Sequence, residues 1–286
     1  MRPARGGLLT DRRAAFGLAV LVVAACAAVL APVIAGDPLL QRDIVATRFL
    51  PPFSSDLHGQ FHLLGTDRFG RDVWARLVYG ARISLSVGAL AVLVSVAVGV
   101  AVGAIAGFWR GWPGLVLLGV TDFALALPRV VLLLLLASLW QPSAVLVVVV
   151  LGLTGWMTIA RLVHGEVRTL AVRPFVEGAI GLGVPGPRVL ARHILPNALT
   201  PVIVASSLGL GNAIMLEAGL SFLGLGVQPP TPSWGNLIAS GRDTLVNAPW
   251  VAAAPGVALV IVVVAATLLG DAVRDRWDPS AGPRGS

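Results

Sequence analysis

The sequence predicts an all-α, polytopic membrane protein with six transmembrane helices. Of its 286 residues 56% are hydrophobic and only 12% are charged, and the mean hydropathy is +0.86. A soluble domain usually contains about 25% charged residues. Long apolar runs, separated by segments that hold most of the Arg, Gly and Pro residues, give the number of spans.

The charged residues exclude several classes of function. All 21 basic residues are Arg. A phosphate-binding P-loop ends in an obligatory Lys, so ATP hydrolysis by this chain is not expected. The net charge of +7 does not indicate nucleic-acid binding, because the Arg residues flank apolar runs instead of gathering on a soluble module. A catalytic set of residues is not recognisable, so the chain is not expected to be an enzyme.

The first predicted span is the uncharged run 14–36, which follows Arg2, Arg5, Arg12 and Arg13. A secretory signal has an apolar core of about 7–15 residues, so this longer run is interpreted as an uncleaved span. The Arg residues before it place the N-terminus in the cytoplasm.

Residues 37–83 form a polar segment that the alternation of sides places outside the cytoplasm. Residues 71–84 put apolar side chains near one stripe and predict a helix at the membrane interface. His58 and His62 have a spacing found in metal sites, but no third ligand accompanies them. Neither a metal site nor a cofactor is therefore expected.

The second predicted span, 84–109, contains Gly88, Gly99, Gly103 and Gly107, spaced mostly by four residues. Small residues at this spacing let two helix backbones approach closely within a membrane. The pattern predicts close packing against another helix, although a Gly-rich span without a preferred partner would have the same composition.

The third predicted span, 115–139, carries Asp122 and Arg129, which are seven residues apart and are expected on one helical face. Charges within a span are costly and mark a site that faces protein or water. Two interpretations remain open. Both side chains pair or extend toward the cytoplasmic surface, or they lie in the translocation path.

The remaining spans are predicted at 144–160, 198–217 and 250–270. Residues 220–249 are too rich in Gly and Pro for one continuous helix, and irregular backbone at membrane depth must be covered by protein or line a water-filled cavity. This segment is predicted to shape the external mouth of a pathway. Glu217 is interpreted either as an acid at the water interface or as a contact in the translocation path.

Residues 161–197 form a charged loop that the Arg bias places in the cytoplasm. A short helix is predicted from Glu177 to Leu182, with the acid near its positive N-terminal end. Gly183 can supply the left-handed residue that ends this helix.

Prolines punctuate the rest of this loop. Pro185 and Pro187 are expected to delay the next helix until about Arg188, and Pro196 is expected to interrupt it at the membrane surface. The predicted product is a protruding knob that suits docking.

One run in the loop has a specific spacing, formed by Glu177, Gly178, Ala179, Gly183 and, after nine more residues, His193, Leu195 and Pro196. This run resembles the cytoplasmic coupling motif of bacterial ABC-importer permeases, in their dipeptide, oligopeptide and nickel branch. Residues 64–85 and 217–235 resemble the same family. The resemblance covers most of residues 60–280.

The resemblance implies the MetI-like fold of type I ABC-importer permeases. It divides the chain into residues 1–83, with the N-terminal tail, first span and extracytoplasmic segment, and residues 84–286, the permease core. It also implies a multi-pass protein of the bacterial cytoplasmic (inner) membrane, surrounded by membrane lipids, with both termini in the cytoplasm.

The implied partners are a second, homologous permease subunit that forms a heterodimer, two cytoplasmic ATP-binding subunits and an extracytoplasmic substrate-binding protein. The implied function is peptide import by alternating access, driven by the partner ATPases. Nickel or another small solute is the alternative cargo of the same machinery. From a different class, a stand-alone secondary transporter would need coupling-ion sites and usually a visible internal repeat.

Gly178 departs from the family pattern, which usually has Ala at this position. Gly costs about 1 kcal/mol of helix stability relative to Ala. The knob is therefore expected to be less rigid until a partner holds it.

Overall fold

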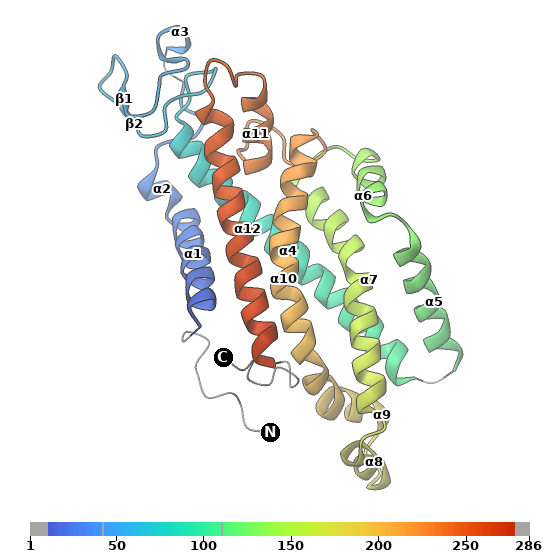
Figure 1. Cartoon of the computed structure of the whole chain (residues 1–286). Helices are drawn as coiled ribbons and strands as arrows, with labels where there is room; N and C mark the ends of the chain where they lie inside the picture. The colour runs from blue at the N-terminus through green and yellow to red at the C-terminus, as the bar shows by residue number, and fades with distance from the viewer. Residues whose placement is uncertain (1–10, 42, 110, 278–286) are drawn as a thin grey trace, which may run out of the picture.

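The computed structural model describes residues 11–41, 43–109 and 111–277, so Arg2 and Arg5 lie outside the described residues. The described chain is mostly helical, with one two-stranded antiparallel hairpin (Figure 1). Its elements are α1 Arg12–Val29, α2 Ala31–Ile34, α3 Ile44–Thr47, β1 Ser54–Ser55, β2 Phe61–His62, α4 Val73–Phe108, α5 Trp112–Ala126, α6 Arg129–Ser138, α7 Ala144–Leu170, α8 Pro174–Gly181, α9 Gly186–Val189, the π-helical turn η2 Leu190–Ile194, α10 Leu195–Phe222, α11 Trp234–Arg242 and α12 Trp250–Trp277.

Five helical segments of the described chain are long and apolar enough to cross a membrane. They are α1, α4, α7, the continuous segment Gly186–Phe222 that joins α9, η2 and α10, and α12. The pair α5 and α6, bent by 90° at its break, completes a sixth span when the two are counted together. The predicted all-helical, polytopic class is therefore confirmed.

The spans form one bundle in which α4 crosses behind α12, α10 and α7 (Figure 1). The helices α8 and α9 project from one end, here called the α8 end, and the β1–β2 hairpin lies at the opposite, hairpin end. The described part of α1 begins, and α12 ends, toward the α8 end. The two ends of the bundle therefore differ: short helices extend beyond the spans at one end and a β-hairpin at the other.

Helix α4 corrects one prediction, because the expected interfacial helix over 71–84 and the span 84–109 form a single helix of 36 residues. Asp72 caps its start and accepts a hydrogen bond from the amide of Ala75 at 2.8 Å. No proline interrupts the helix, so nothing in the sequence stops it near Ser84. The predicted boundary between the N-terminal segment and the permease core, after residue 83, falls inside α4. The division of the chain there stays a prediction.

The third span is also different from its prediction. Helix α5 ends at Ala126 and Leu127 is extended, with φ −77° and ψ 137°. The next residue is Pro128, and a proline disfavours helical geometry in the residue before it. Asp122 and Arg129 therefore lie on separate helices, and the prediction that they share one helical face is wrong.

The glycines of α4 confirm the predicted close packing of this span. A Cβ atom at Gly103 would lie 2.8 Å from the Cβ atom of Val163 and would collide with the backbone of Ala160. A Cβ atom at Gly99 would lie 2.6 Å from that of Ile159. The small residues thus bring the backbone of α4 against the backbone of α7.

The segment 220–249 is not irregular throughout, because it contains α11. A capping box starts this helix: the amide of Asn236 donates to Ser233 Oγ at 3.3 Å, and the amide of Ser233 donates to Asn236 Oδ1 at 3.0 Å. The amide of Trp234 donates to Ser84 Oγ at 3.2 Å, which joins α11 to α4. The role of this segment at a pathway mouth stays a prediction.

A buried ion cluster organises the hairpin end. Asp67 is only 2% exposed and accepts hydrogen bonds from Arg71 Nε at 2.8 Å and from Arg76. Nearby, His62 Nδ1 lies 2.6 Å from Asp72 Oδ2 and links the hairpin to the start of α4. These contacts fix the polar segment onto the bundle.

Candidate functional sites: a membrane cavity and the α8 surface

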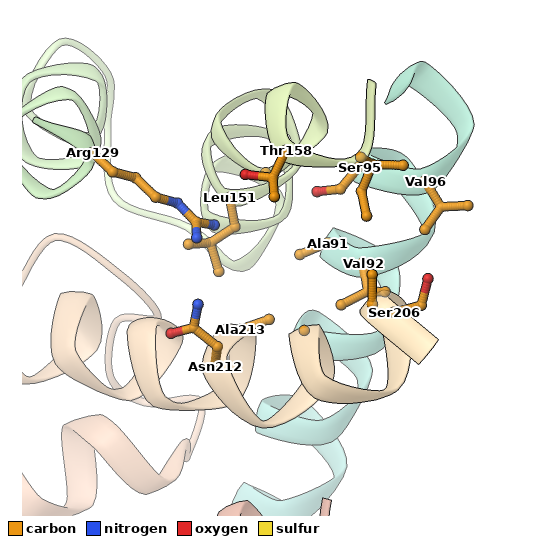
Figure 2. A pocket seen from close by; sticks show the side chains of 14 residues that line it. Ala91, Val92, Ser95, Val96, Arg129, Leu151, Thr158, Ser206, Asn212 and Ala213 are labelled. Atoms are coloured by element: carbon orange, nitrogen blue, oxygen red, sulfur yellow. The ribbon is translucent and has the colours of Figure 1, made fainter. Parts of the chain in front are cut away.

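A cavity of about 160 Å³ lies between α4, α6, α7 and α10 (Figure 2). Its walls come from the middle stretches of α4, α7 and α10, so it lies at mid-depth of the bundle. Apolar side chains form much of the lining. The lining residues that can form polar interactions through their side chains are Ser95, Arg129, Thr158, Ser206 and Asn212.

Asp122 and Arg129 have different environments. Asp122 Oδ1 lies 3.0 Å from Arg161 Nη1, and both side chains are exposed by more than a third. This ion pair fits the pairing interpretation for Asp122. Arg129 instead lines the cavity, and within the described residues it forms no ion pair.

Glu217 is fully buried, with 0% exposure, and is not an acid at a water interface. The hydroxyl of Ser221 donates to its Oε1 atom at 2.8 Å. The same hydroxyl oxygen accepts from the amide of Val227 at 3.0 Å. Glu217 therefore helps to hold the chain that follows α10, and a role in translocation stays a prediction.

The loop at the α8 end contains a short helix that Gly183 ends as predicted. Helix α8 begins at Pro174, three residues before the predicted start, with Glu177 in its first turn. Gly183 has φ +79°, its amide donates to the Ile180 carbonyl at 2.9 Å, and the next amide, of Val184, donates to the Ala179 carbonyl at 3.1 Å. This pair of bonds is a Schellman motif.

The prolines after Gly183 act differently from the prediction. Pro185 caps α9, which starts at Gly186, and Pro187 occupies its first turn, where the missing amide proton costs no intrahelical bond. Pro196 does not interrupt the helix. The π-helical turn η2 ends at Ile194, two residues before Pro196, and the amide of Leu195 donates to the Leu190 carbonyl. This wider turn shifts the carbonyls that a proline ring would otherwise meet.

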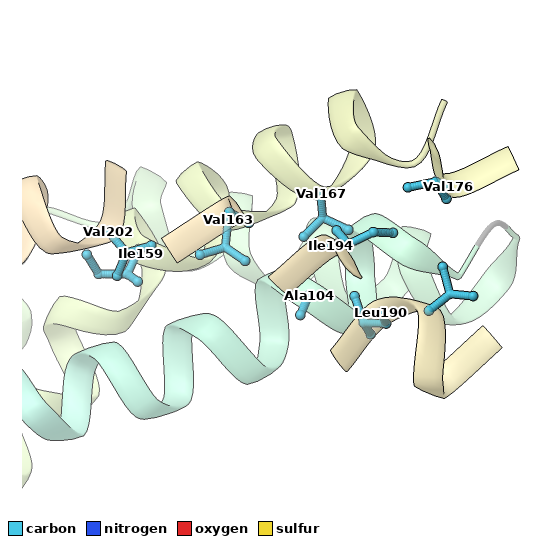
Figure 3. Close-up of a cluster of buried hydrophobic side chains, with 10 residues drawn as sticks. Ala104, Ile159, Val163, Val167, Val176, Leu190, Ile194 and Val202 are labelled. Atoms are coloured by element: carbon cyan, nitrogen blue, oxygen red, sulfur yellow. The ribbon is translucent and has the colours of Figure 1, made fainter. Parts of the chain in front are cut away.

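A buried cluster fixes the loop to the spans (Figure 3). Val176 of α8 and Ile194 of η2 are fully buried, and they belong to the same cluster as Val163 and Val167 of α7 and Ala104 of α4. Ala179 and Leu195 pack against this cluster from partly buried positions. Displacement of α8 would therefore act directly on α4, α7 and α10.

The opposite side of α8 is exposed and apolar. Leu182 is 87% exposed, and Val172, Phe175 and Ile180 are also exposed beside the exposed Glu177. We call these five residues the α8 surface. Exposed apolar side chains that gather on one surface are typical of sites that contact another protein or a membrane. The sequence motif identified Glu177 but missed the four apolar residues, whose signal was their presence in a loop rich in Gly and Arg.

The other residues of the sequence motif differ in exposure and in the element that carries them. Gly178 and Gly183 are exposed, His193 is half-buried in η2, and Pro196 is exposed in the first turn of α10.

Replacing Gly178 with Ala is expected to stabilise α8 by about 0.5–1 kcal/mol. Gly178 lies inside the helix, and nothing lies within 4 Å of the Cβ atom that Ala would add. Hydrogen exchange of the α8 amides should slow. Gly183→Ala is the matched control and is expected to destabilise the end of α8, because φ at this position is +79°, which a residue with a Cβ atom disfavours.

Comparisons with known proteins identify the family. The family described as binding-protein-dependent transport system inner membrane component matches residues 99–282. A relative named as a peptide permease in Brucella suis biovar 1 is 38% identical over 275 residues, which cover 96% of this chain and 89% of the relative. The dipeptide transport system permease protein of Alkalihalophilus pseudofirmus is 38% identical over 218 residues, 76% of this chain and 72% of the relative.

This chain belongs to that family of permeases. It is a multi-pass membrane subunit of an ABC importer, and ATP hydrolysis takes place in partner subunits. The family implies ATP-binding subunits and another permease subunit around it. The fold also resembles the MetNI methionine ABC transporter in an inward-facing conformation, with a TM-score of 0.56 at 18% identity, covering 71% of this chain and 97% of that chain. The MetI-like permease fold is thereby confirmed.

Proposed function

We propose that this permease subunit moves di- or oligopeptides across the bacterial inner membrane by alternating access. Support for a peptide cargo comes from the names of its relatives, which include peptide permeases and a dipeptide permease. The cavity at mid-depth of the bundle supplies polar groups that a peptide can contact.

The α8 surface is the proposed docking site of a cytoplasmic ATPase, and it is the observation that carries the proposal. Its exposed Phe175, Ile180 and Leu182 can fill an apolar groove, while Glu177 remains available for a polar contact. Because Val176 of the same helix is buried against α7, closure of the ATPases would move the spans. The loop would then transmit a coupling free energy between the nucleotide site and the cargo site.

The docking site sets the proposed orientation. The α8 end faces the cytoplasm and both termini are on this side, as the excess of Arg in the segments at this end supports. The hairpin end then faces an extracytoplasmic substrate-binding protein. A second, homologous permease completes a heterodimer around the pathway.

Replacing Leu182 with Asp is expected to weaken ATPase docking, because it places a charge in the centre of the proposed contact. Loss of one buried Leu contact and desolvation of a carboxylate together cost about 3 kcal/mol or more, which corresponds to a roughly 100-fold weaker interaction. Copurification of the ATPase subunits and cargo-stimulated ATP hydrolysis in the reconstituted importer measure the loss.

Leu57→Asp is the matched control, since Leu57 is 84% exposed at the hairpin end. This variant should retain the ATPase subunits. Equal ATPase binding by wild type and Leu182→Asp would contradict the docking role. Gradient-driven uptake by the purified chain alone, without ATP or partners, would contradict the importer mechanism itself.

A further inference from the structure

We propose that the cavity between α4, α6, α7 and α10 binds a carboxylate of the cargo through Arg129 and Asn212. This inference deepens the proposed function, and its cargo assignment rests on peptide import. The site would hold one anionic end of the cargo at mid-depth of the membrane.

The position of Arg129 follows from the break of the third span. Arg129 is the first residue of α6, directly after Pro128. Its side chain extends from α6 toward α7, and Figure 2 shows Arg129 and Asn212 on opposite sides of the cavity. A Cβ atom at Gly155 would lie 3.5 Å from Arg129 Nη2, so the guanidinium group lies against the backbone of α7.

The charge of the lining is positive. None of the residues that line the cavity is acidic, and among the described residues Arg129 forms no ion pair. By contrast, Asp122 is paired with Arg161. A charge at membrane depth is costly, so an Arg without an acidic partner among the described residues is a candidate functional contact. An incoming anion would balance Arg129.

The available hydrogen-bond donors also favour a carboxylate. The hydroxyl groups of Ser95 and Ser206 donate to backbone carbonyls at 3.2 and 2.6 Å. Arg129 and Asn212 form no side-chain hydrogen bond within the described residues, so their N–H groups can both donate to a ligand. A planar guanidinium matches the two oxygens of a carboxylate. A free metal cation would be repelled.

The size of the cavity limits what it holds. Pockets for drug-sized ligands occupy about 300–1,000 Å³. A volume of about 160 Å³ suits a carboxylate group with its neighbouring atoms and water, but not a whole peptide. The cavity is therefore a subsite for one terminus or one acidic side chain.

The first test measures the charge preference of the cavity without any cargo. The exposed Cys26 is replaced by Ser and Thr158 by Cys in the assembled importer in membrane vesicles. Modification rates are compared for a sulfonate-bearing and a trimethylammonium-bearing methanethiosulfonate. Arg129→Gln should lower the ratio of anionic to cationic rates about tenfold, and Arg129→Lys should restore it. Arg242→Gln, at an Arg whose side chain is 65% exposed, is the matched control that should not change the ratio.

An unchanged ratio in Arg129→Gln would overturn the anion site. If neither reagent modifies Thr158→Cys in any nucleotide state, the inference that the cavity is accessible to water would be overturned.

The second test compares uptake of dialanine and of its C-terminal amide by the complete importer. Arg129→Gln should reduce uptake of the free acid at least about tenfold relative to the amide, because only the acid carries the carboxylate. Dividing each variant rate by the wild-type rate cancels the preference of the substrate-binding protein. An equal loss for both compounds would assign Arg129 a structural role and overturn the inference. Absence of peptide uptake by the wild-type importer, beside a normal charge preference in the first test, would overturn the peptide cargo and leave the anion site intact.

Discussion

Gly103→Leu is expected to prevent α4 and α7 from packing and to destabilise the subunit by about 3 kcal/mol or more. A Cβ atom at this position would already collide with the backbone of Ala160 and with Val163. Backbone cannot move aside as a flexible side chain can, so the two helices must separate. The yield of folded protein in detergent and its midpoint of thermal unfolding measure the effect.

Gly119→Leu in α5 is the matched control for this substitution. Gly119 is exposed, and no atom lies within 4 Å of a Cβ atom placed there, so a side chain can begin at this position without a backbone collision. Leucine also has a higher helix propensity than glycine. A Gly103→Leu protein as stable as the Gly119→Leu protein would show that α4 and α7 do not depend on close backbone contact.

Asp67→Asn is expected to destabilise the hairpin end by about 3–5 kcal/mol. The variant preserves the shape of the side chain but leaves Arg71 and Arg76 buried without the carboxylate that lies between them. Arg76 is only 2% exposed, so water cannot replace the lost partner. Hydrogen exchange and protease resistance of residues 43–72 should reveal the loosened segment.

Asp243→Asn provides the comparison, because Asp243 pairs with Arg242 at 3.2 Å through side chains that are 60% and 65% exposed. Exposed ion pairs contribute about 0–1 kcal/mol. Equal protease resistance in the Asp67→Asn and Asp243→Asn proteins would contradict a structural role for the buried cluster.

The sequence predicted features whose cause is local or whose pattern is strong. Long apolar runs predicted the spans, the glycine spacing of α4 predicted a close helix partner, and Gly183 was correctly expected to end α8 in a left-handed conformation. Each of these outcomes depends on a residue type and its near neighbours.

Features that depend on compensation between distant residues could not be predicted in this way. Pro128 and Pro196 both lie in apolar helical sequence, yet the first accompanies a 90° bend, whereas the π turn η2 accommodates the second. Glu217 was considered at a water interface, but tertiary packing buries it. The sequence spacing of Asp122 and Arg129 suggested that they share one helical face, but the bend places them on separate helices. Asp122 pairs with Arg161 of α7, and Arg129 lines the cavity.

The accessibility of residue 182 tests the central claim most directly. A single cysteine at this position, Leu182→Cys with Cys26→Ser, is treated with a membrane-impermeant maleimide. If α8 is the cytoplasmic docking site of an ATPase, the cysteine should not be labelled in intact cells. It should be labelled rapidly in inverted vesicles from which the ATPase has been removed, and it should be protected when the ATPase is added back. Labelling from outside intact cells, or equal labelling with and without the ATPase, would contradict it.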